Sequence, residues 1–165
     1  MKKLFLLRHA KSSWEDSTLS DIERPLNKRG KRDAPFMAKL IRQKEILVDA
    51  IYSSHAIRAL KTAEIFSKEL NIKKENFIVE EKIYEAGIKE LCNLVNDIPD
   101  EYFSVMIVGH NPGLTSFANF LGNKYIDNIP TCGIVGFEFR LKKWEEIERG
   151  SGEIFLFEYP KKYFK

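Results

Sequence analysis

Short apolar runs alternate along the chain with longer segments in which apolar residues recur every three or four positions. The runs are too short for helices and predict buried strands at residues 4–7, 47–52, 77–80 and 105–108. The periodic segments predict helices at residues 27–43, 57–70 and 91–98, and a fourth after residue 113. Residues 134–141 and 154–159 alternate in the manner of strands. Strands that alternate with helices favour an α/β sheet covered by helices on both faces.

Local signals sharpen some of these boundaries. Asn27 is a good N-cap for the first helix, and Pro35 is expected to bend that helix or delay its start. Ser53 and Ser54 end the second strand and can cap the helix that follows. The polar segment 11–24 is expected to be a loop. With no linker, repeat or low-complexity segment in it, the chain is expected to form a single domain over residues 1–165.

Composition adds little to this picture. The chain is 44% hydrophobic and 31% charged, which is ordinary for a globular protein, and its net charge of +3 is too small to identify a partner. Cys92 and Cys132 lack metal-ligand spacing and are expected to be free thiols in a reducing compartment. The apolar run after Lys2 and Lys3 is too short for a signal peptide, and no stretch approaches a membrane span. We therefore expect a cytoplasmic protein without membrane contact.

Two of the three histidines occupy equivalent places. His9 follows the first strand and His110 follows the strand 105–108, while Arg8 precedes His9 and Arg58 lies in the first turn of a helix after another strand. The carboxyl ends of parallel strands share one edge of a sheet, where open α/β folds bind ligands. Two arginines and two histidines at that edge form a pocket suited to a phosphoryl group, because the planar guanidinium matches phosphate oxygens.

Two other interpretations compete with this one. A histidine at a strand end is more often a structural residue with satisfied hydrogen bonds than a catalyst. The three histidines together could also bind zinc, but Arg8 and Arg58 would repel a dication, and no cysteine or carboxylate has ligand spacing. From the residues alone, the site is an anion-binding edge with a histidine that could act as a nucleophile.

Four segments in order resemble the motifs of the histidine-phosphatase superfamily, also called phosphoglycerate-mutase-like: LFLLRHAKSSW from Leu4, RPLNKRG from Arg24, SSHAIRALKTAEIF from Ser53 and VGHNPGL from Val108. A lone RHA would be weak evidence, whereas four ordered motifs are strong. The sequences of two of these motifs, RHAKSSW and VGHNPG, are most similar to those of the SixA-type phosphohistidine phosphatases. The resemblance implies a three-layer α/β/α sandwich with a mostly parallel central sheet.

The resemblance also implies roles for individual residues. His9 would attack phosphorus through one ring nitrogen while a backbone carbonyl holds the other, giving a phosphohistidine intermediate. Arg8, Arg58 and His110 would bind the equatorial oxygens and stabilise the transition state. No metal or other cofactor is implied, because the guanidinium groups supply the positive charge. Asn111 and the pair Ser12–Ser13 would add hydrogen bonds to the phosphate, or serve only as turn and capping residues.

His55 departs from the family pattern, and Glu85 has two interpretations. The family usually has proline where this chain has His55, which could simply begin the helix. Glu85, in KIYEAG, falls where many relatives keep the acid that protonates the leaving group, or it is a solvated loop residue. The difference matters because an alkoxide needs a proton far more than the imidazole of a phosphohistidine does.

The function expected from this resemblance is a phosphatase that acts on a phosphohistidine protein or a small phosphoester. A catalytically silent module that binds phosphate or an acidic partner is the alternative from another class, and a phosphoglycerate-mutase-type phosphotransferase is a third. Lys28, Arg29, Lys31 and Arg32 form a basic cluster that is either a solvated face or a docking surface for an acidic protein. No nucleic acid is expected as a partner, because no aromatic stacking platform is interleaved with the cluster.

Overall fold

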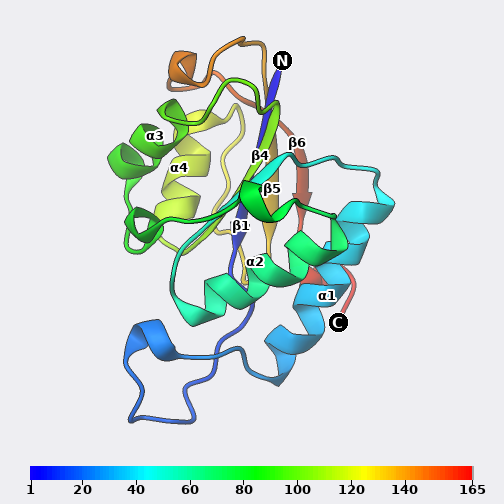
Figure 1. Ribbon diagram of the computed structural model, residues 1–165, viewed down its shortest axis with the longest axis vertical. Helices are drawn as coiled ribbons and strands as arrows, with labels where there is room; N and C mark the ends of the chain where they lie inside the picture. The colour runs from blue at the N-terminus through cyan, green and yellow to red at the C-terminus, as the bar shows by residue number, and fades with distance from the viewer. Residues whose placement is uncertain (165) are drawn as a thin grey trace.

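The apolar runs form the centre of one six-stranded sheet in the computed structural model, which describes residues 1–164 (Figure 1). The strands are β1 (Lys2–Arg8), β2 (Ala50–Ser53), β3 (Phe77–Val79), β4 (Ser104–Gly109), β5 (Ile134–Phe139) and β6 (Glu153–Glu158). Their spatial order is β3-β2-β4-β1-β5-β6. The first four in that order are parallel, β5 is antiparallel to β1, and β6 is antiparallel to β5. The sheet is therefore mostly parallel, as expected.

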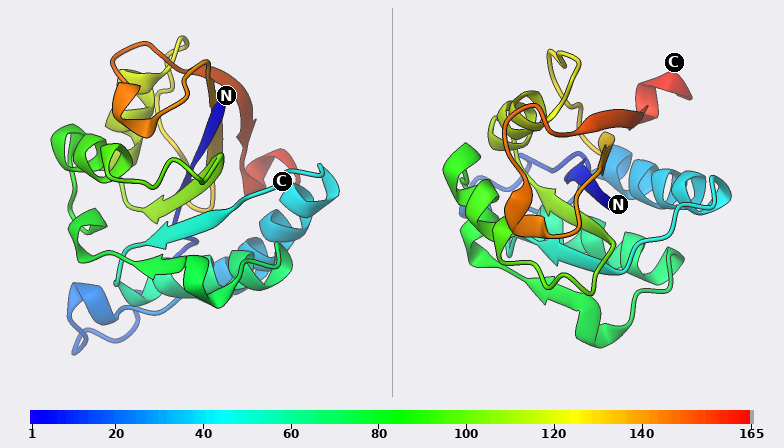
Figure 2. Two further views of the ribbon diagram at one scale, coloured as in Figure 1. Left: turned by 45° about the horizontal axis from the view of Figure 1, so that its top comes forward. Right: turned by 90° about the horizontal axis from the view of Figure 1, so that it is seen from above.

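Helices cover both faces of this sheet (Figures 1 and 2). Helices α1 (Lys28–Gln43) and α2 (Ile57–Glu69) pack on one face, and α3 (Ile88–Asn96) and α4 (Gly113–Leu121) pack on the other. The alternation of β1 shows why: Leu4 and Leu6 join the core under α3 and α4, whereas Phe5 and Leu7 join the core under α1 and α2. The three-layer α/β/α architecture inferred from the sequence is confirmed.

Some boundaries differ from the sequence-based predictions. The second strand begins at Ala50, where pairing with β4 starts, and Leu47 lies outside it with 82% of its surface exposed. Helix α1 begins at Lys28 and continues through Pro35, so the proline does not delay it, and the Asn27 side chain accepts a hydrogen bond from the Gly30 amide at 2.9 Å. The residue that caps α2 is Ala56, not Ser53 or Ser54.

The register of the parallel strands creates the edge on which the candidate residues meet. Arg8 lies beside Gly109, and Ser53 lies beside Val108. The next residue of each chain segment, His9, His110 and Ser54, therefore emerges at the same carboxyl edge. Within the described residues, no helix is long and apolar enough to cross a membrane.

Candidate active site

His9 is fixed at the end of β1 with one defined ring nitrogen engaged. Its Nδ1 lies 2.7 Å from the carbonyl oxygen of Ala10, and because a carbonyl only accepts, Nδ1 carries the hydrogen. The Ala10 amide in turn donates to Thr62 Oγ1 of α2 at 3.0 Å, which holds this loop against the helix. Burial lowers the pKa of His9 to about 3, and the nearby cations act in the same direction. At neutral pH the ring is therefore uncharged, and the lone pair is on Nε2.

Arg8 and Arg58 each keep one buried donor without a partner. Arg8 Nη1 donates to the Ile129 carbonyl at 3.0 Å, while Arg58 Nη1 and Nη2 donate to the backbone and carboxylate of Asp21 at 2.6 and 2.9 Å. The Nε atoms of both arginines are buried and have no hydrogen-bond partner among residues 1–164. Buried N–H groups are nearly always paired in folded proteins, so two such donors in one place suit an acceptor such as a phosphate oxygen.

His110 supplies a third donor of the same kind. Its Nε2 lies 2.8 Å from Ser54 Oγ, which already accepts the Ala56 amide at 3.2 Å. Ser54 is fully buried, and His110 Nε2 is the one acceptor within reach of its hydroxyl in the described chain, so the hydroxyl hydrogen points to Nε2. The hydrogen of His110 is then on Nδ1, which is buried and unpaired within the described chain. Burial, followed by the charge of Arg58, lowers the pKa of His110 to about 4. Its ring centre lies 5.2 Å from that of His9.

These four side chains line a small cavity of about 270 Å³, here called the His9 pocket. It also contains Lys11, Ser12, Arg24 and Thr131. Arg8, Arg58 and His110 in this lining each have one unpaired N–H donor, and His9 has an unprotonated ring nitrogen. A tetrahedral anion with several acceptor oxygens fits such a donor set. The neutral imidazole of His9 can attack the central atom of such an anion directly, because Nε2 already has a lone pair.

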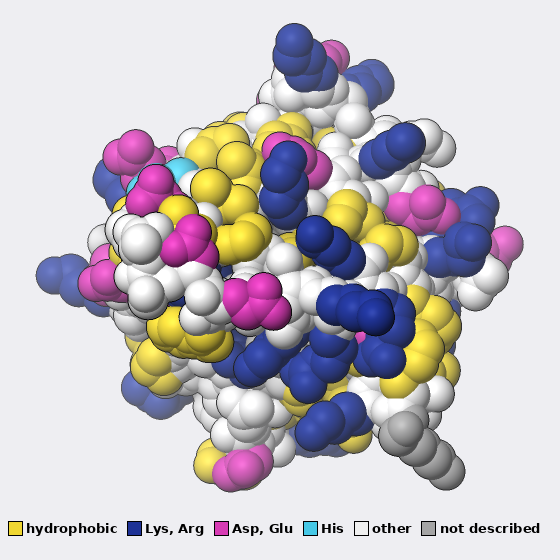
Figure 3. Space-filling model, turned by 90° about the horizontal axis from the view of Figure 1, so that it is seen from below, with side chains coloured by type: hydrophobic (Ala, Val, Ile, Leu, Met, Phe, Trp, Pro, Cys, Tyr) yellow, Lys and Arg dark blue, Asp and Glu magenta, His cyan; other side chains and the backbone are white. Residues whose placement is uncertain are grey.

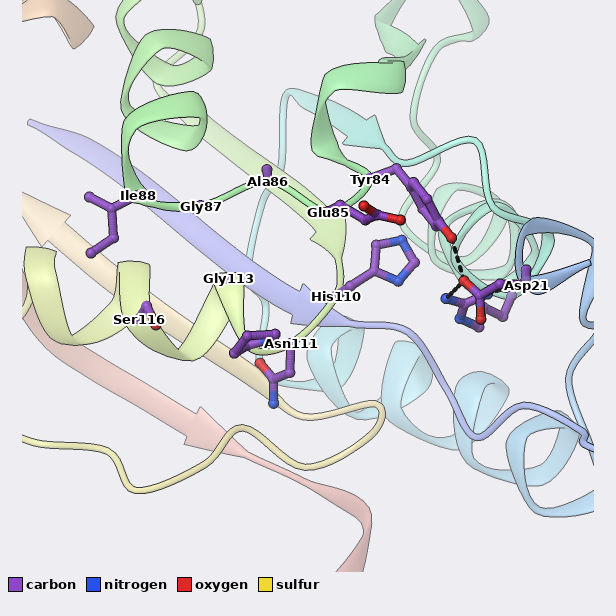
Figure 4. Close-up of a pocket in the computed structure, with 12 residues that line it drawn as sticks. Asp21, Tyr84, Glu85, Ala86, Gly87, Ile88, His110, Asn111, Gly113 and Ser116 are labelled. Carbon is purple, nitrogen blue, oxygen red and sulfur yellow. Dashed lines mark hydrogen bonds and ion pairs between the residues drawn. The ribbon is translucent and has the colours of Figure 1, made fainter.

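A larger cavity of about 500 Å³ adjoins the His9 pocket and shares Arg58, His110 and Asn111 with it. We call it the Tyr84 cavity, after the residue whose hydroxyl donates to the Asp21 carboxylate across it (Figure 4). That hydrogen bond is the largest cause that lowers the pKa of Asp21 to about 2, and Arg58 contributes to the same shift. Asp21 is therefore an anion at neutral pH that holds Arg58 in place.

Glu85 also lines the Tyr84 cavity, on the turn between the 3-10 helix Glu81–Ile83 and α3. Its carboxylate lies in the space in front of the His110 ring in Figure 4, and its side chain is exposed. Glu85 has φ of 59°, a conformation uncommon for a residue with a side chain. Gly113 fixes this turn from the other side, because a Cβ there would lie 2.0 Å from the Ala86 carbonyl oxygen. The structure thus places Glu85 in the same cavity as His110 without burying it.

The remaining predicted residues differ in how free they are to bind phosphate. Both amide hydrogens of Asn111 are already donated, to Asn128 Oδ1 at 2.9 Å and to the Ile129 carbonyl at 3.0 Å. Its geometry therefore favours the turn-residue interpretation. Ser12 lines the His9 pocket and accepts from Arg24 at 2.7 Å, which leaves its hydroxyl hydrogen available. Ser13 accepts the Glu15 amide and lies outside the pocket lining.

Sequence reasoning missed three residues that organise the site. Asp21 accepts from Arg58, Arg24 and Tyr84, and Arg24 also bonds Ser12. Asp21 lies in a segment whose composition predicts only a loop, and nothing in the KIYEAG segment assigns Tyr84 a role. Arg24 opens the RPLNKRG motif, so its place in a family motif is the one signal that points to it. His55 stacks edge-on against Tyr84 at 5.6 Å and lines neither cavity.

The lowered histidine pKa values predict an acid-sensitive fold. The unfolded chain binds protons near pH 6.5, whereas the folded chain does so only near pH 4 at His110 and pH 3 at His9. Between these values the unfolded state binds more protons, so the free energy of unfolding should fall as pH is lowered from about 6.5 to 4. Each histidine contributes a slope of about 1.4 kcal/mol per pH unit. Urea unfolding at pH 7, 6 and 5 would measure this fall in the free energy of unfolding.

His110→Gln is the matched control for this prediction, because it removes one of the two titrations and should remove a corresponding part of the slope. Asp21 does not interfere, since its lowered pKa affects stability only below its ordinary value of about 3.8. A free energy of unfolding that stays constant from pH 7 to 5 would contradict the assigned neutral histidines.

Metal ligation finds no geometric support here. Within residues 1–164, no three or more His, Cys, Asp or Glu side chains are grouped so that they could hold a metal ion. The three histidines of the zinc interpretation do not form such a group, because His55 faces Tyr84 rather than the His9 pocket.

Solved structures of other proteins share the fold of this chain. The fold resembles the SixA protein of Agrobacterium tumefaciens, with a TM-score of 0.80, 24% identity, and coverage of 96% of this chain and 99% of that one. It also resembles the protein histidine phosphatase SixA in complex with tungstate, with a TM-score of 0.78, 20% identity, and coverage of 97% and 98% of the two chains.

Among sequence relatives, an uncharacterised chloroplastic protein of Arabidopsis thaliana is 30% identical over 92% of this chain and 72% of its own length. An uncharacterised protein of Mycobacterium tuberculosis is 26% identical over 94% of this chain and 100% of its own length. The model of the histidine phosphatase superfamily (branch 1) matches residues 4–115, which include His9, Arg58 and His110. The chain belongs to the histidine phosphatase superfamily.

Proposed function

We propose that this phosphatase removes the phosphoryl group from a phosphohistidine side chain of a protein, through a phosphohistidine intermediate on His9. The observation that carries the proposal is the His9 pocket, in which a neutral histidine with a free Nε2 lies among three buried, unpaired N–H donors. These donors match the equatorial oxygens of a phosphoryl group under attack, whose negative charge they stabilise.

The reaction has two balanced steps. His9 Nε2 attacks phosphorus, and the new N–P bond forms as the bond to the substrate imidazole breaks; that imidazole leaves with a proton from solvent. Water then attacks the phosphoryl group on His9, the N–P bond breaks, and inorganic phosphate departs while Nε2 regains its lone pair. The hydrogen bond from Nδ1 to Ala10 keeps Nε2 in position through both steps and stabilises the positive charge on the phosphorylated ring.

The choice of phosphohistidine rests on the supply of protons. The carboxyl groups that line the Tyr84 cavity are Asp21 and Glu85. Asp21 is held as an anion by Tyr84 and Arg58 and cannot donate a proton at neutral pH. Glu85 is exposed on a turn and is not enclosed against the His9 pocket. A site without an enclosed proton donor suits a leaving group that departs readily, such as imidazole, and similarity in fold to SixA proteins supports the same choice.

The direct test compares substrates on the purified protein. A peptide phosphorylated on histidine should be hydrolysed with a higher kcat/KM than an alkyl phosphate, with p-nitrophenyl phosphate between them. Chelators should leave the rates unchanged, and vanadate, which mimics five-coordinate phosphorus, should inhibit all three. Loss of activity in chelator that a divalent ion restores would favour the zinc interpretation. Alkyl phosphate turnover without any phosphohistidine turnover would favour a small phosphoester as substrate.

Glu85 separates these substrate classes. If it is the general acid, Glu85→Gln should lower kcat on alkyl phosphates by roughly 10²–10⁴-fold. Phosphohistidine should be affected much less, because its nitrogen leaving group is protonated by solvent, and aryl phosphates should fall between the two. The measurement is kcat on the three substrates with one variant.

Glu81→Gln is a suitable control, since Glu81 is also exposed and begins the 3-10 helix just before Glu85 but does not line the Tyr84 cavity. An equal loss on all three substrates would mean that Glu85 acts through structure or binding. No loss on any of them would make it a solvated loop residue.

A further inference from the structure

A basic groove lies beside the His9 pocket, and the proposed reaction makes no use of it. The groove has a volume of about 480 Å³ and shares Arg8, Lys11 and Thr131 with the pocket. Its other cations come from distant parts of the chain, Arg29 and Arg32 from α1 and Lys161 from the 3-10 helix Pro160–Lys162. Figure 3 shows the face at the carboxyl edge of the sheet, on which Lys and Arg side chains gather in a continuous cluster.

The positive charge of this groove is unfavourable for the fold itself. Helix α1 begins with four cations, Lys28, Arg29, Lys31 and Arg32, and has no acidic residue in its first turn. Cations at a helix N-terminus oppose the helix dipole and lower stability, so this arrangement is not explained by helix formation. Asp33 is the one acidic residue in the groove lining, and it pairs closely with Arg32 at 2.8 Å and more distantly with Arg29 at 3.9 Å. The groove therefore retains a large excess of positive charge.

The groove is also held at a fixed distance from the nucleophile. The first turn of α1 rests directly on the loop after His9, because a Cβ at Gly30 would lie 2.2 Å from the Lys11 carbonyl oxygen. Arg29 donates to Thr131 at 3.2 Å, and the Arg32 guanidinium lies 4.0 Å from the centre of the Phe164 ring. Ligands in the groove and in the His9 pocket would therefore lie in one defined arrangement.

We propose that the basic groove binds acidic side chains of the protein that carries the phosphohistidine, next to the phosphorylated residue. This inference rests on the proposed function and names its class of partner. The cations are spread over three segments, and the Arg29 side chain is 45% exposed, so a chain of carboxylates can contact more of them than one small anion can. Nucleic acids are less suited to this groove, because Arg32 already covers one face of Phe164 and Arg24 covers one face of the nearby Trp14, which reduces the aromatic surface on which bases could stack.

The test uses two peptides that carry the same phosphohistidine, one flanked by Glu and Asp and the other by Gln and Asn. At low ionic strength, the wild-type protein should show a KM roughly 10-fold lower for the acidic peptide, with equal kcat, because the groove adds binding without touching the reacting atoms. In 1 M salt, where the Debye length is about 3 Å, the difference should largely disappear.

The double variant Arg29→Gln with Lys161→Gln should abolish the preference for the acidic peptide and leave the KM of the neutral peptide unchanged. These two residues are chosen because the pair of Arg32 with the buried Asp33 remains intact. The matched control is Arg42→Gln with Lys142→Gln, which removes one arginine at the other end of α1 and one exposed lysine, neither of which lines the groove. The control should keep the preference.

Fluorescence anisotropy with the unphosphorylated acidic peptide separates failure of this inference from failure of the proposed function, because it requires no turnover. Binding by the wild-type protein that the double variant loses supports the groove even if phosphohistidine is not hydrolysed. Equal KM values for both peptides on the wild-type protein would overturn the inference. Loss of the preference for the acidic peptide in the control variant would also overturn it. The same holds if the groove lowers the KM only for a small molecule that carries a second phosphate and not for the acidic peptide.

Discussion

His9→Ala should reduce turnover of every phosphorylated substrate by at least about 10⁴-fold, because it removes the ring nitrogen that forms the proposed covalent intermediate in the His9 pocket. The fold should persist, because His9, although only 8% exposed, lies at the edge of the sheet and belongs to neither apolar core. Rapid quenching of the wild-type protein with labelled substrate should trap acid-labile phosphate on His9. The substitution should abolish that signal.

His55→Ala is the matched control, because it removes a histidine at the same edge that lines neither cavity. It should retain most of the turnover and form the phosphoenzyme normally. Near-normal turnover by His9→Ala, or phosphate trapped on another residue, would contradict the proposed mechanism.

Arg58→Ala should lower kcat/KM by roughly 10³–10⁵-fold, the range observed when an arginine that stabilises a phosphoryl transition state is removed. Arg58 is 5% exposed, and its unpaired Nε is one of the three donors of the His9 pocket. The substitution also leaves the Asp21 carboxylate without its partner beside the pocket, where it repels phosphate. Arg58→Lys should recover only a small part of the loss, because an ammonium group cannot engage Asp21 and phosphate in the same plane.

Asp21→Asn tests the positioning of Arg58 separately. The arginine keeps its charge and its bond to the Asp21 backbone carbonyl but loses the carboxylate that holds Nη2. We expect a smaller loss than for Arg58→Ala, together with tighter inhibition by vanadate, because an anion beside the phosphate site is removed. An Arg58→Ala variant within tenfold of wild-type activity and vanadate affinity would show that Arg58 does not bind the phosphoryl group.

The sequence by itself determined the layers of this protein and the position of His9, the proposed nucleophile. Runs such as 4–7 and 105–108 are apolar throughout, and only strands buried on both faces fit that pattern. Because parallel strands share one carboxyl edge, the order of the residues alone predicts that His9 and His110, which follow two such runs, lie close together. The cap at Asn27 was equally local, since it depends on residues within one turn.

The tertiary structure alone decided how the charges around His9 are arranged. Asp21 meets Arg58 across 37 positions of sequence and Tyr84 across 63, and no local spacing encodes such contacts. The same holds for Asn111, whose amide bonds Ile129 instead of remaining free, and for the groove to which α1 and Lys161 both contribute. Local periodicity indicates which face of a helix or strand is buried. The hydrogen-bond partner of a polar group depends instead on which distant segments the packed layers bring within reach.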